Sequence, residues 1–134
     1  MNKTTMATFR KHEILRGKRS VSRLFENGKT VSRHPLKLVW VPCDGQGHLS
    51  PARVLISVPR KTFRKAHDRN LIKRRIREAY RQLKTSFYEE LEKHTLCIDI
   101  GLIYTGKEIA TYHEISQQID KLLAIVVRHA EKGT

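Results

Sequence analysis

The chain has 134 residues, of which 27 are Lys or Arg and 13 are Asp or Glu, so its formal net charge is +14. This length predicts a single domain, and such a positive charge favours nucleic acid or an anionic surface as the partner. No run approaches the roughly 18 consecutive apolar residues of a membrane-spanning helix, and the first residues lack the apolar centre of a signal peptide. We therefore expect a cytoplasmic protein with no membrane partner.

The positive charge is concentrated in two segments. Residues 60–84 contain eleven Lys or Arg and two acids, and residues 10–37 contain nine and two. Residues 85–134 contain five basic and eight acidic residues. We expect the two basic segments to meet a polyanion and the last third of the chain to build the core.

Residues 1–11 are predicted to form a flexible basic N-terminus, and residues 12–134 a single α+β domain. Its first helix is predicted over residues 18–27, where Val21, Leu24 and Phe25 recur at helical spacing. The following Asn27-Gly28 predicts a helix end in the left-handed conformation.

Three apolar runs predict strands, at residues 36–41, 54–58 and 96–104. The first is followed by the turn sequence Asp44-Gly45-Gln46-Gly47, and residues 60–67 are expected to add a short extended piece. The two cysteines, Cys43 and Cys97, could pair. In a reducing compartment we predict two small, half-buried thiols instead.

The most informative segment is the basic helix predicted over residues 68–84, with Asp68 as its N-cap. At about 100° per residue, its apolar residues fall in one arc and most of its polar residues in the adjoining arc. The apolar arc contains Ile72, Ile76, Ala79, Tyr80 and Leu83, and the polar arc contains Arg69, Asn70, Lys73, Arg74, Arg77 and Arg81.

A charged helix face is usually only a solvated surface. Such a surface commonly alternates the signs of its charges, whereas here like charges repeat at a spacing of four, which is unfavourable in an isolated helix. We therefore favour a surface that binds an anion.

A last helix is predicted over residues 110–129. The order helix, strands, helix, strand, helix indicates an α+β fold in which helices pack on one mixed sheet. The residues predicted for the buried side of the last helix are Tyr112, Ile115, Ile119, Leu122, Leu123 and Val126.

No constellation of catalytic side chains can be assembled from the sequence. Gly28-Lys29-Thr30 resembles the end of a phosphate-binding P-loop, but Arg23 stands where the first glycine is required. Cys43 and His48 are the closest Cys and His residues, and no second pair follows at zinc-finger spacing. We predict no catalytic residue and no metal ligand on this chain.

Two residues have both a binding and a structural interpretation. The amide of Asn70 could meet a base edge or a 2′-hydroxyl, or it could bond to the first turn of its own helix. Phe25 could stack on an unpaired base or belong to the core. An extended segment, not a helix, precedes the basic helix, so the spacing does not indicate a helix-turn-helix protein that binds DNA.

The motif Arg69-Asn70-x-x-Lys73-Arg74-x-x-Arg77-Glu78 resembles the signature helix of the bacterial ribonuclease P protein subunit, the small basic partner of a catalytic RNA. The resemblance covers most of the chain. Residues 21–29 are similar to the first helix of that family, residues 36–41 to its first strand, and residues 56–61 to the strand before the signature.

This resemblance implies a single α-β-β-β-α-β-α domain with a mixed central sheet and a left-handed β-α-β crossover around the signature helix. It also implies an accessory, RNA-binding subunit of an endoribonuclease, with the catalytic groups on the RNA. Its partners would be the catalytic RNA and the 5′ leader of precursor tRNA, with Mg²⁺ bound mainly by the RNA. No protein partner is implied.

The resemblance also assigns roles to particular residues. The catalytic RNA would meet Arg69, Asn70, Lys73, Arg74 and Arg77. Val21 and Phe25 would lie in a groove for the single-stranded leader, with Val21 at a position where the family has a second aromatic residue. Further basic residues that would touch RNA are Arg60, Lys61, Arg64, Lys65 and Arg81.

Other functional classes remain open. A general RNA chaperone or a ribosome-associated protein would bind unrelated structured RNAs equally well. A DNA-binding regulator would prefer duplex DNA, and an autonomous nuclease would cleave without RNA.

Overall fold

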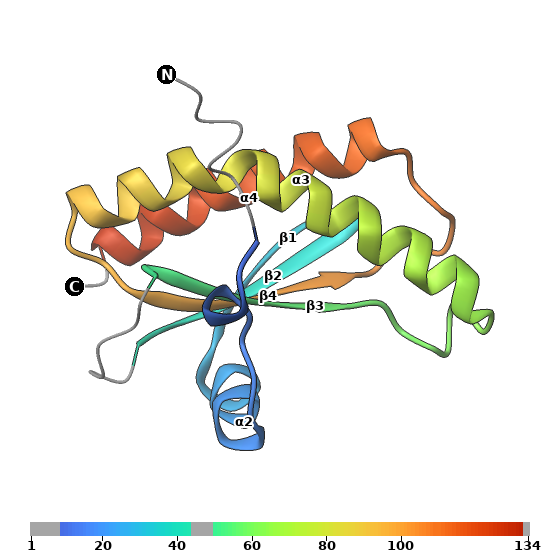
Figure 1. Ribbon diagram of the computed structural model, residues 1–134, viewed down its shortest axis with the longest axis horizontal. Helices are drawn as coiled ribbons and strands as arrows, with labels where there is room; N and C mark the ends of the chain where they lie inside the picture. Colours follow the sequence, from blue (N-terminus) through green and yellow to red (C-terminus); the bar gives the residue numbers. More distant parts are fainter. Residues whose placement is uncertain (1–8, 44–49, 133–134) are drawn as a thin grey trace.

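A computed structural model describes residues 9–43 and 50–132 as one α+β domain (Figure 1). The turn predicted at Asp44-Gly45-Gln46-Gly47 lies outside these residues, as does the stretch 1–8 of the expected flexible N-terminus. Within the described ranges, no helix is both long and apolar enough to cross a membrane. The elements are η1 (Lys11–Glu13), α2 (Lys18–Asn27), β1 (Lys29–Arg33), β2 (Leu36–Pro42), β3 (Ala52–Ser57), α3 (Ala66–Lys93), β4 (Ile98–Tyr104) and α4 (Tyr112–Lys132).

The four strands form one mixed sheet in the order β1-β2-β4-β3. β2 pairs antiparallel with both β1 and β4, whereas β3 and β4 are parallel and are connected through α3. The element order confirms the α-β-β-β-α-β-α arrangement with a mixed sheet. The left hand of the crossover stays an expectation from the family resemblance.

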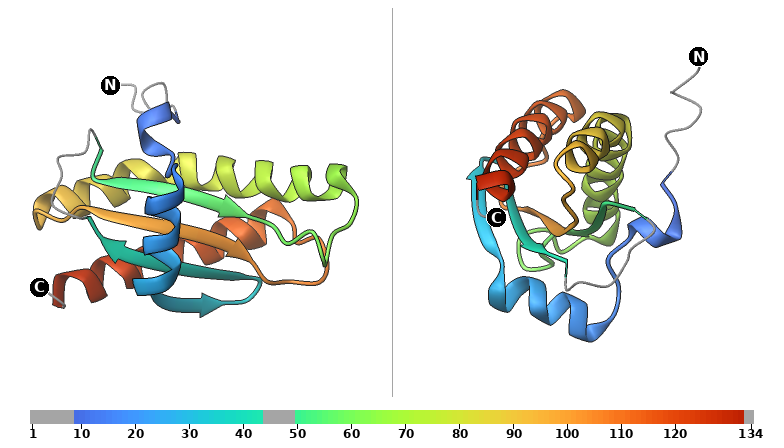
Figure 2. Two further views of the ribbon diagram at one scale, coloured as in Figure 1. Left: turned by 90° about the horizontal axis from the view of Figure 1, so that it is seen from below. Right: turned by 90° about the vertical axis from the view of Figure 1, so that its left-hand side faces the viewer.

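The two faces of the sheet are covered differently. α3 and α4 lie side by side on one face and run in the same direction, and the shorter α2 crosses the other face (Figures 1 and 2). Because successive side chains of a strand point to opposite faces, each strand supplies both layers. In β2, Leu38 and Trp40 belong to the large core under α3 and α4, while Val39 and Val41 belong to a smaller core under α2.

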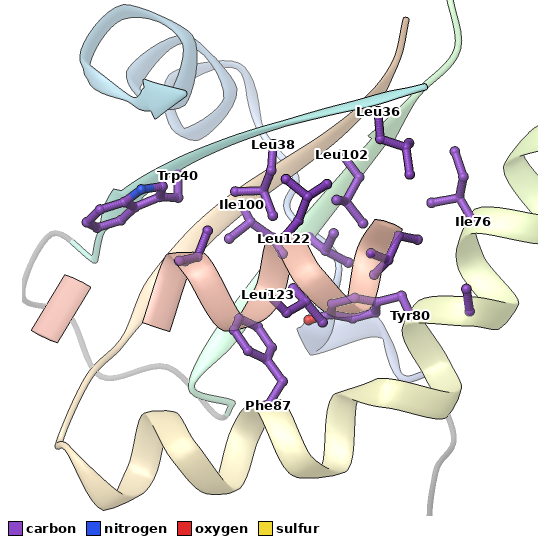
Figure 3. Packing of buried hydrophobic residues seen from close by; sticks show 14 of the residues in the cluster. Leu36, Leu38, Trp40, Ile76, Tyr80, Phe87, Ile100, Leu102, Leu122 and Leu123 are labelled. Carbon is purple, nitrogen blue, oxygen red and sulfur yellow. The ribbon is translucent and has the colours of Figure 1, made fainter. Parts of the chain in front are cut away.

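The large core joins the sheet to both long helices (Figure 3). From the sheet, Leu102 and its neighbours point toward Leu122 and Leu123 of α4 and toward Tyr80 of α3. The apolar arc predicted for the basic helix is confirmed for Ile72, Ile76, Ala79 and Tyr80, which are fully buried; Leu83 is partly buried.

The small core is centred on Leu24, the buried residue of α2. It rests on the sheet where Gly101 has no side chain, since a Cβ there would lie 3.0 Å from Leu24 Cδ2. The predicted left-handed end of α2 is wrong, because Gly28 has φ −75° and ψ 150°. Glycine is needed there for space instead, since a Cβ would clash with the Leu24 carbonyl and with Val39.

Several predicted boundaries around the basic helix are wrong. Residues 60–67 form a turn and the start of a helix, not an extended piece, and α3 begins at Ala66 with Lys65 at the N-cap position. Asp68 therefore lies inside the first turn, where its charge still complements the helix dipole. β1 was not predicted from the sequence, because its strand has no apolar face and only Val31 is partly buried.

The last helix begins two residues later than predicted. Thr111 Oγ1 accepts a hydrogen bond from the Glu114 amide, and Glu114 Oε1 accepts one from the Thr111 amide, which forms a capping box. Tyr112 is therefore in the first turn and is 38% exposed, so its predicted burial is wrong.

A buried polar cluster attaches the N-terminal segment to α3. Lys84 Nζ donates to Glu13 Oε1 over 2.5 Å, and Tyr88 donates to the same oxygen over 2.7 Å. Burial raises the pKa of Glu13, but the hydrogen bonds from Lys84, Tyr88 and the Arg10 amide outweigh it and leave that pKa below its usual value. Lys84 belongs to the basic segment by sequence, yet it is a core residue.

The prediction of two free thiols is wrong, because Cys43 and Cys97 form a disulfide. The antiparallel register pairs Pro42 with Ile98, and the Cys43 amide donates to the Cys97 carbonyl over 2.9 Å. This pairing sets the two Cα atoms 5.4 Å apart, within the range that a disulfide spans.

Reduction of the disulfide is expected to lower the free energy of unfolding by about 2–4 kcal/mol, because the crosslink joins residues 54 positions apart and restricts the unfolded chain. Urea denaturation with and without a reductant measures this change. The matched control, Cys43→Ser with Cys97→Ser, should not respond to the reductant. An identical midpoint for the oxidised and reduced protein would contradict the expectation.

Candidate nucleic-acid interface

The first half of α3 exposes a cationic surface beside its buried side. Asn70, Arg74 and Arg77 are exposed, and Lys73 is partly exposed. These four residues and Arg69 share the arc next to the one that packs on the sheet, so the arrangement predicted from helical spacing is present. We call Asn70, Lys73, Arg74 and Arg77 the α3 surface.

Two of the predicted arginines also have partners within the chain. Arg69 Nη1 donates to the carbonyls of Phe63 and Arg64 over 2.8 and 2.9 Å, so its guanidinium braces the preceding loop. Arg81 donates to both oxygens of Glu78 over 2.9 and 2.6 Å. The hydrogen bond from Arg81 is the main reason that the pKa of Glu78 falls to about 2.

Arg75 lies outside the α3 surface and has a structural role. Its Nη1 donates to the Ala110 carbonyl over 2.6 Å and so holds α3 to the segment before α4. Residue type alone does not distinguish this arginine from its neighbours. Its position on the helical wheel, outside both arcs, is the signal that separates it.

Asn70 is the fifth residue of α3, well past the N-cap at Lys65. The capping interpretation is therefore wrong, and the exposed amide extends from the same side of the helix as the cations around it. A neutral donor and acceptor among cations suits a group that offers both functions, such as a base edge or a ribose hydroxyl.

The loop between β3 and α3 continues the cationic surface. Arg60, Lys61, Arg64 and Lys65 are all exposed. Phe63, between them, is buried and meets the Tyr104 ring edge-on at a centroid distance of 5.7 Å. One aromatic anchor thus fixes a loop whose other long side chains face solvent.

The side chain of Phe25 is 49% exposed, so its interpretation as a core residue is wrong; Val21 is partly buried. At about 100° per residue, these two residues lie on one flank of α2 and Arg23 lies on the other, with Leu24 between them facing the sheet. Arg23 Nη2 donates to the carbonyl of Pro42, at the end of β2. The flank with Phe25 therefore faces the beginning of β2.

On the face of the sheet that α2 covers, a row of side chains lies at the level of the beginning of β2, which is the part of the sheet that the Phe25 flank faces. Lys37, Ile103 and Ser57 are neighbours in register across β2, β4 and β3, and all three are partly exposed. We call Val21, Phe25 and this row the α2 surface. Sequence reasoning missed the row, although an isolated Lys37 between Leu36 and Leu38 is the pattern of a strand with one open face.

The α2 surface and the α3 surface are joined by the chain itself. β3 ends at Ser57, the loop with its four exposed cations follows, and α3 begins at Ala66. Figure 1 shows the start of α3 beyond the end of β3. The four exposed loop cations and the beginning of α3 thus lie at the end of the sheet where β3 ends.

These features define a class of protein: a small basic α+β domain with a cationic helix, a partly open sheet face and an exposed aromatic ring on the helix that crosses that face. A family model described as Ribonuclease P matches residues 9–127. The chain therefore belongs to the ribonuclease P protein family.

Individual relatives agree with this assignment. The ribonuclease P protein component of Chlorobium phaeobacteroides is 30% identical over 125 residues, which cover 87% of this chain and 86% of the relative. The solved RNase P protein from Thermotoga maritima is 25% identical, with a TM-score of 0.65 and coverage of 83% of this chain and 94% of that one. The Staphylococcus aureus RNase P protein, at 23% identity and a TM-score of 0.63, has the same fold.

Truncation of two adjacent residues of α2 should lower the free energy of unfolding by very different amounts. Phe25→Ala is expected to lower the free energy of unfolding by only about 0.5–1.5 kcal/mol, because about half of the residue is exposed. Leu24→Ala should cost about 2–5 kcal/mol, because it empties the centre of the small core. Urea denaturation of both variants measures the difference, and a large loss for Phe25→Ala would show that its ring is part of the core.

Proposed function

We propose that this chain is the protein subunit of ribonuclease P, which binds a catalytic RNA and the 5′ leader of precursor tRNA. With Mg²⁺, the complex removes the leader and gives the mature 5′ end of the tRNA. The observation that carries this proposal is the family match over residues 9–127, together with an exposed cationic surface on the signature helix.

The α3 surface is the proposed site for the catalytic RNA. Arginine binds phosphate oxygens through its planar fork and lysine as a point charge, so Arg74, Arg77 and Lys73 would position the helix on the RNA backbone. Arg69 and Arg81 would take a smaller part, because each already bonds within the chain. Asn70 would add a contact that distinguishes RNA from a simple polyanion.

The α2 surface is the proposed site for the leader. A half-exposed Phe25 can stack on an unpaired base, a contact worth about 1–3 kcal/mol. Val21, one turn earlier on the same flank, offers apolar contact without stacking. Lys37 lies where it could neutralise a leader phosphate.

The chemistry of the two surfaces indicates which steps the protein would assist and which the RNA would carry out. Their cations and amides can neutralise and position RNA, but they do not activate water. Hydrolysis would therefore be carried out by the RNA with its Mg²⁺, through a metal-activated water and an in-line displacement. Cationic side chains repel a divalent ion, so we propose that the RNA phosphates hold the metal. The proposed compartment is the cytoplasm.

Cleavage of precursor tRNA at low Mg²⁺ concentration tests the proposal. Catalytic RNA is assayed with and without this protein, and the protein is expected to raise the cleavage rate because it lowers the electrostatic repulsion between the two RNAs. No stimulation would overturn the proposal. Equal binding to unrelated structured RNAs would favour a general RNA chaperone instead.

Arg74→Ala should weaken binding to the catalytic RNA and lower the salt dependence of that binding by about one counterion, because it removes one phosphate contact. The matched control is Arg128→Ala, an exposed arginine on the outer side of α4. Titrations at several salt concentrations measure both slopes. If the two variants have the same slope as the wild type, Arg74 does not belong to the interface.

A further inference from the structure

A buried carboxylate lies under α2, outside both proposed RNA surfaces. Asp99 is 1% exposed and sits in β4, between Arg53 of β3 and Val41 of β2 in the register of the sheet. A carboxylate removed from water in this way is tolerated only where cations or hydrogen-bond donors compensate it.

Asp99 has two arginine partners. Arg53 donates Nε to Oδ1 over 3.0 Å and Nη2 to Oδ2 over 2.9 Å, which is the bidentate geometry. Arg23 Nη1 lies 3.9 Å from Oδ2, and its Nη2 donates to the Pro42 carbonyl. Arg53 comes from the sheet, but Arg23 comes from α2, so one guanidinium connects the helix to a carbonyl by a hydrogen bond and to a carboxylate by an ion pair, both on the strands beneath it.

The apolar contacts of α2 alone do not fix its rotation. Within this ten-residue helix, Leu24 is the buried residue. One buried side chain sets where the helix rests on the sheet, but by itself it resists a roll about the helix axis only weakly. The polar contacts of Arg23, on one flank of Leu24, oppose that roll.

The opposite flank carries Val21 and Phe25. Any roll of the helix that releases Arg23 from Asp99 and Pro42 also moves the Phe25 ring relative to Lys37 and Ile103. We propose that Asp99 and Arg23 are positioning residues, which hold α2 in the orientation that presents Phe25 to the RNA leader. This inference rests on the proposed function of the α2 surface.

Arg23 could instead contact an RNA phosphate directly, since its side chain is 28% exposed. The two roles make different demands. A phosphate contact needs a positive charge, which lysine also supplies, whereas the positioning role needs a planar fork that reaches Asp99 and the Pro42 carbonyl together. Arg23→Lys therefore separates the two roles.

The experiment uses the reconstituted complex of protein and catalytic RNA. Affinity is measured for a precursor tRNA with a leader of several nucleotides and for the same tRNA without a leader. The variants are Arg23→Ala, Arg23→Lys and Asp99→Asn, and the matched control is Arg19→Ala, an exposed cation on the solvent side of α2. Thermal unfolding identifies any variant that does not fold.

We expect Arg23→Ala and Arg23→Lys to weaken binding of the leader-bearing substrate by about three- to tenfold, up to the loss that Phe25→Ala itself produces. The affinity for the leaderless tRNA should not change, and neither should the salt dependence of binding to the leader-bearing substrate. In a Phe25→Ala background the effect of Arg23→Ala should disappear, because both substitutions would act on the same contact. Asp99→Asn, if folded, should reproduce Arg23→Ala.

Three results would overturn the inference. In the first, Arg23→Lys binds the leader-bearing substrate with wild-type affinity. In the second, Arg23→Ala lowers the salt slope of binding, and in the third, Arg23→Ala weakens the binding of both substrates equally. If the wild-type complex itself does not prefer the leader-bearing substrate, the proposed function of the α2 surface fails instead, so the two failures are distinguishable.

Discussion

The fold depends on one constraint, which is that β4 must be covered on both faces. Ile98, Ile100 and Leu102 face α3 and α4, while Asp99 and Gly101 face α2. β4 is a central strand, paired with β2 on one side and β3 on the other. The two long helices cover one face and α2 covers the other, so each proposed RNA surface lies beside its own core.

The part of the structure that could be predicted from sequence is the part governed by local periodicity. Helical spacing separated the buried side of α3 from its cationic side, and both Ile76 and Arg74 lie where that spacing placed them. The apolar runs located β2, β3 and β4 within a few residues. Periodicity also gave the order helix, strands, helix, strand, helix, and the family resemblance added a third strand before the signature helix, where β1 has no apolar pattern.

The parts that could not be predicted depend on contacts between distant segments. Lys84 looks like one more cation of the basic run, but it is buried because Glu13, 71 positions away, compensates its charge. Cys43 and Cys97 pair because of a strand register that no local pattern encodes. The proposed structural role of Arg23 has the same origin, since its hydrogen-bond and ion-pair partners lie on two strands that follow it in the chain.

The common direction of α3 and α4 makes the molecule an electric dipole. Both helices begin at the end of the sheet where β3 ends and the loop with the exposed Arg60 and Arg64 follows, so the partial positive charges of two helix N-termini add to that end (Figure 1). Glu90 and Glu92 lie in the last turns of α3, at the opposite end. A molecule polarised in this way turns in the field of a polyanion before it touches it. With the proposed RNA partner, such orientation during approach would come from the backbone itself and would favour a productive encounter.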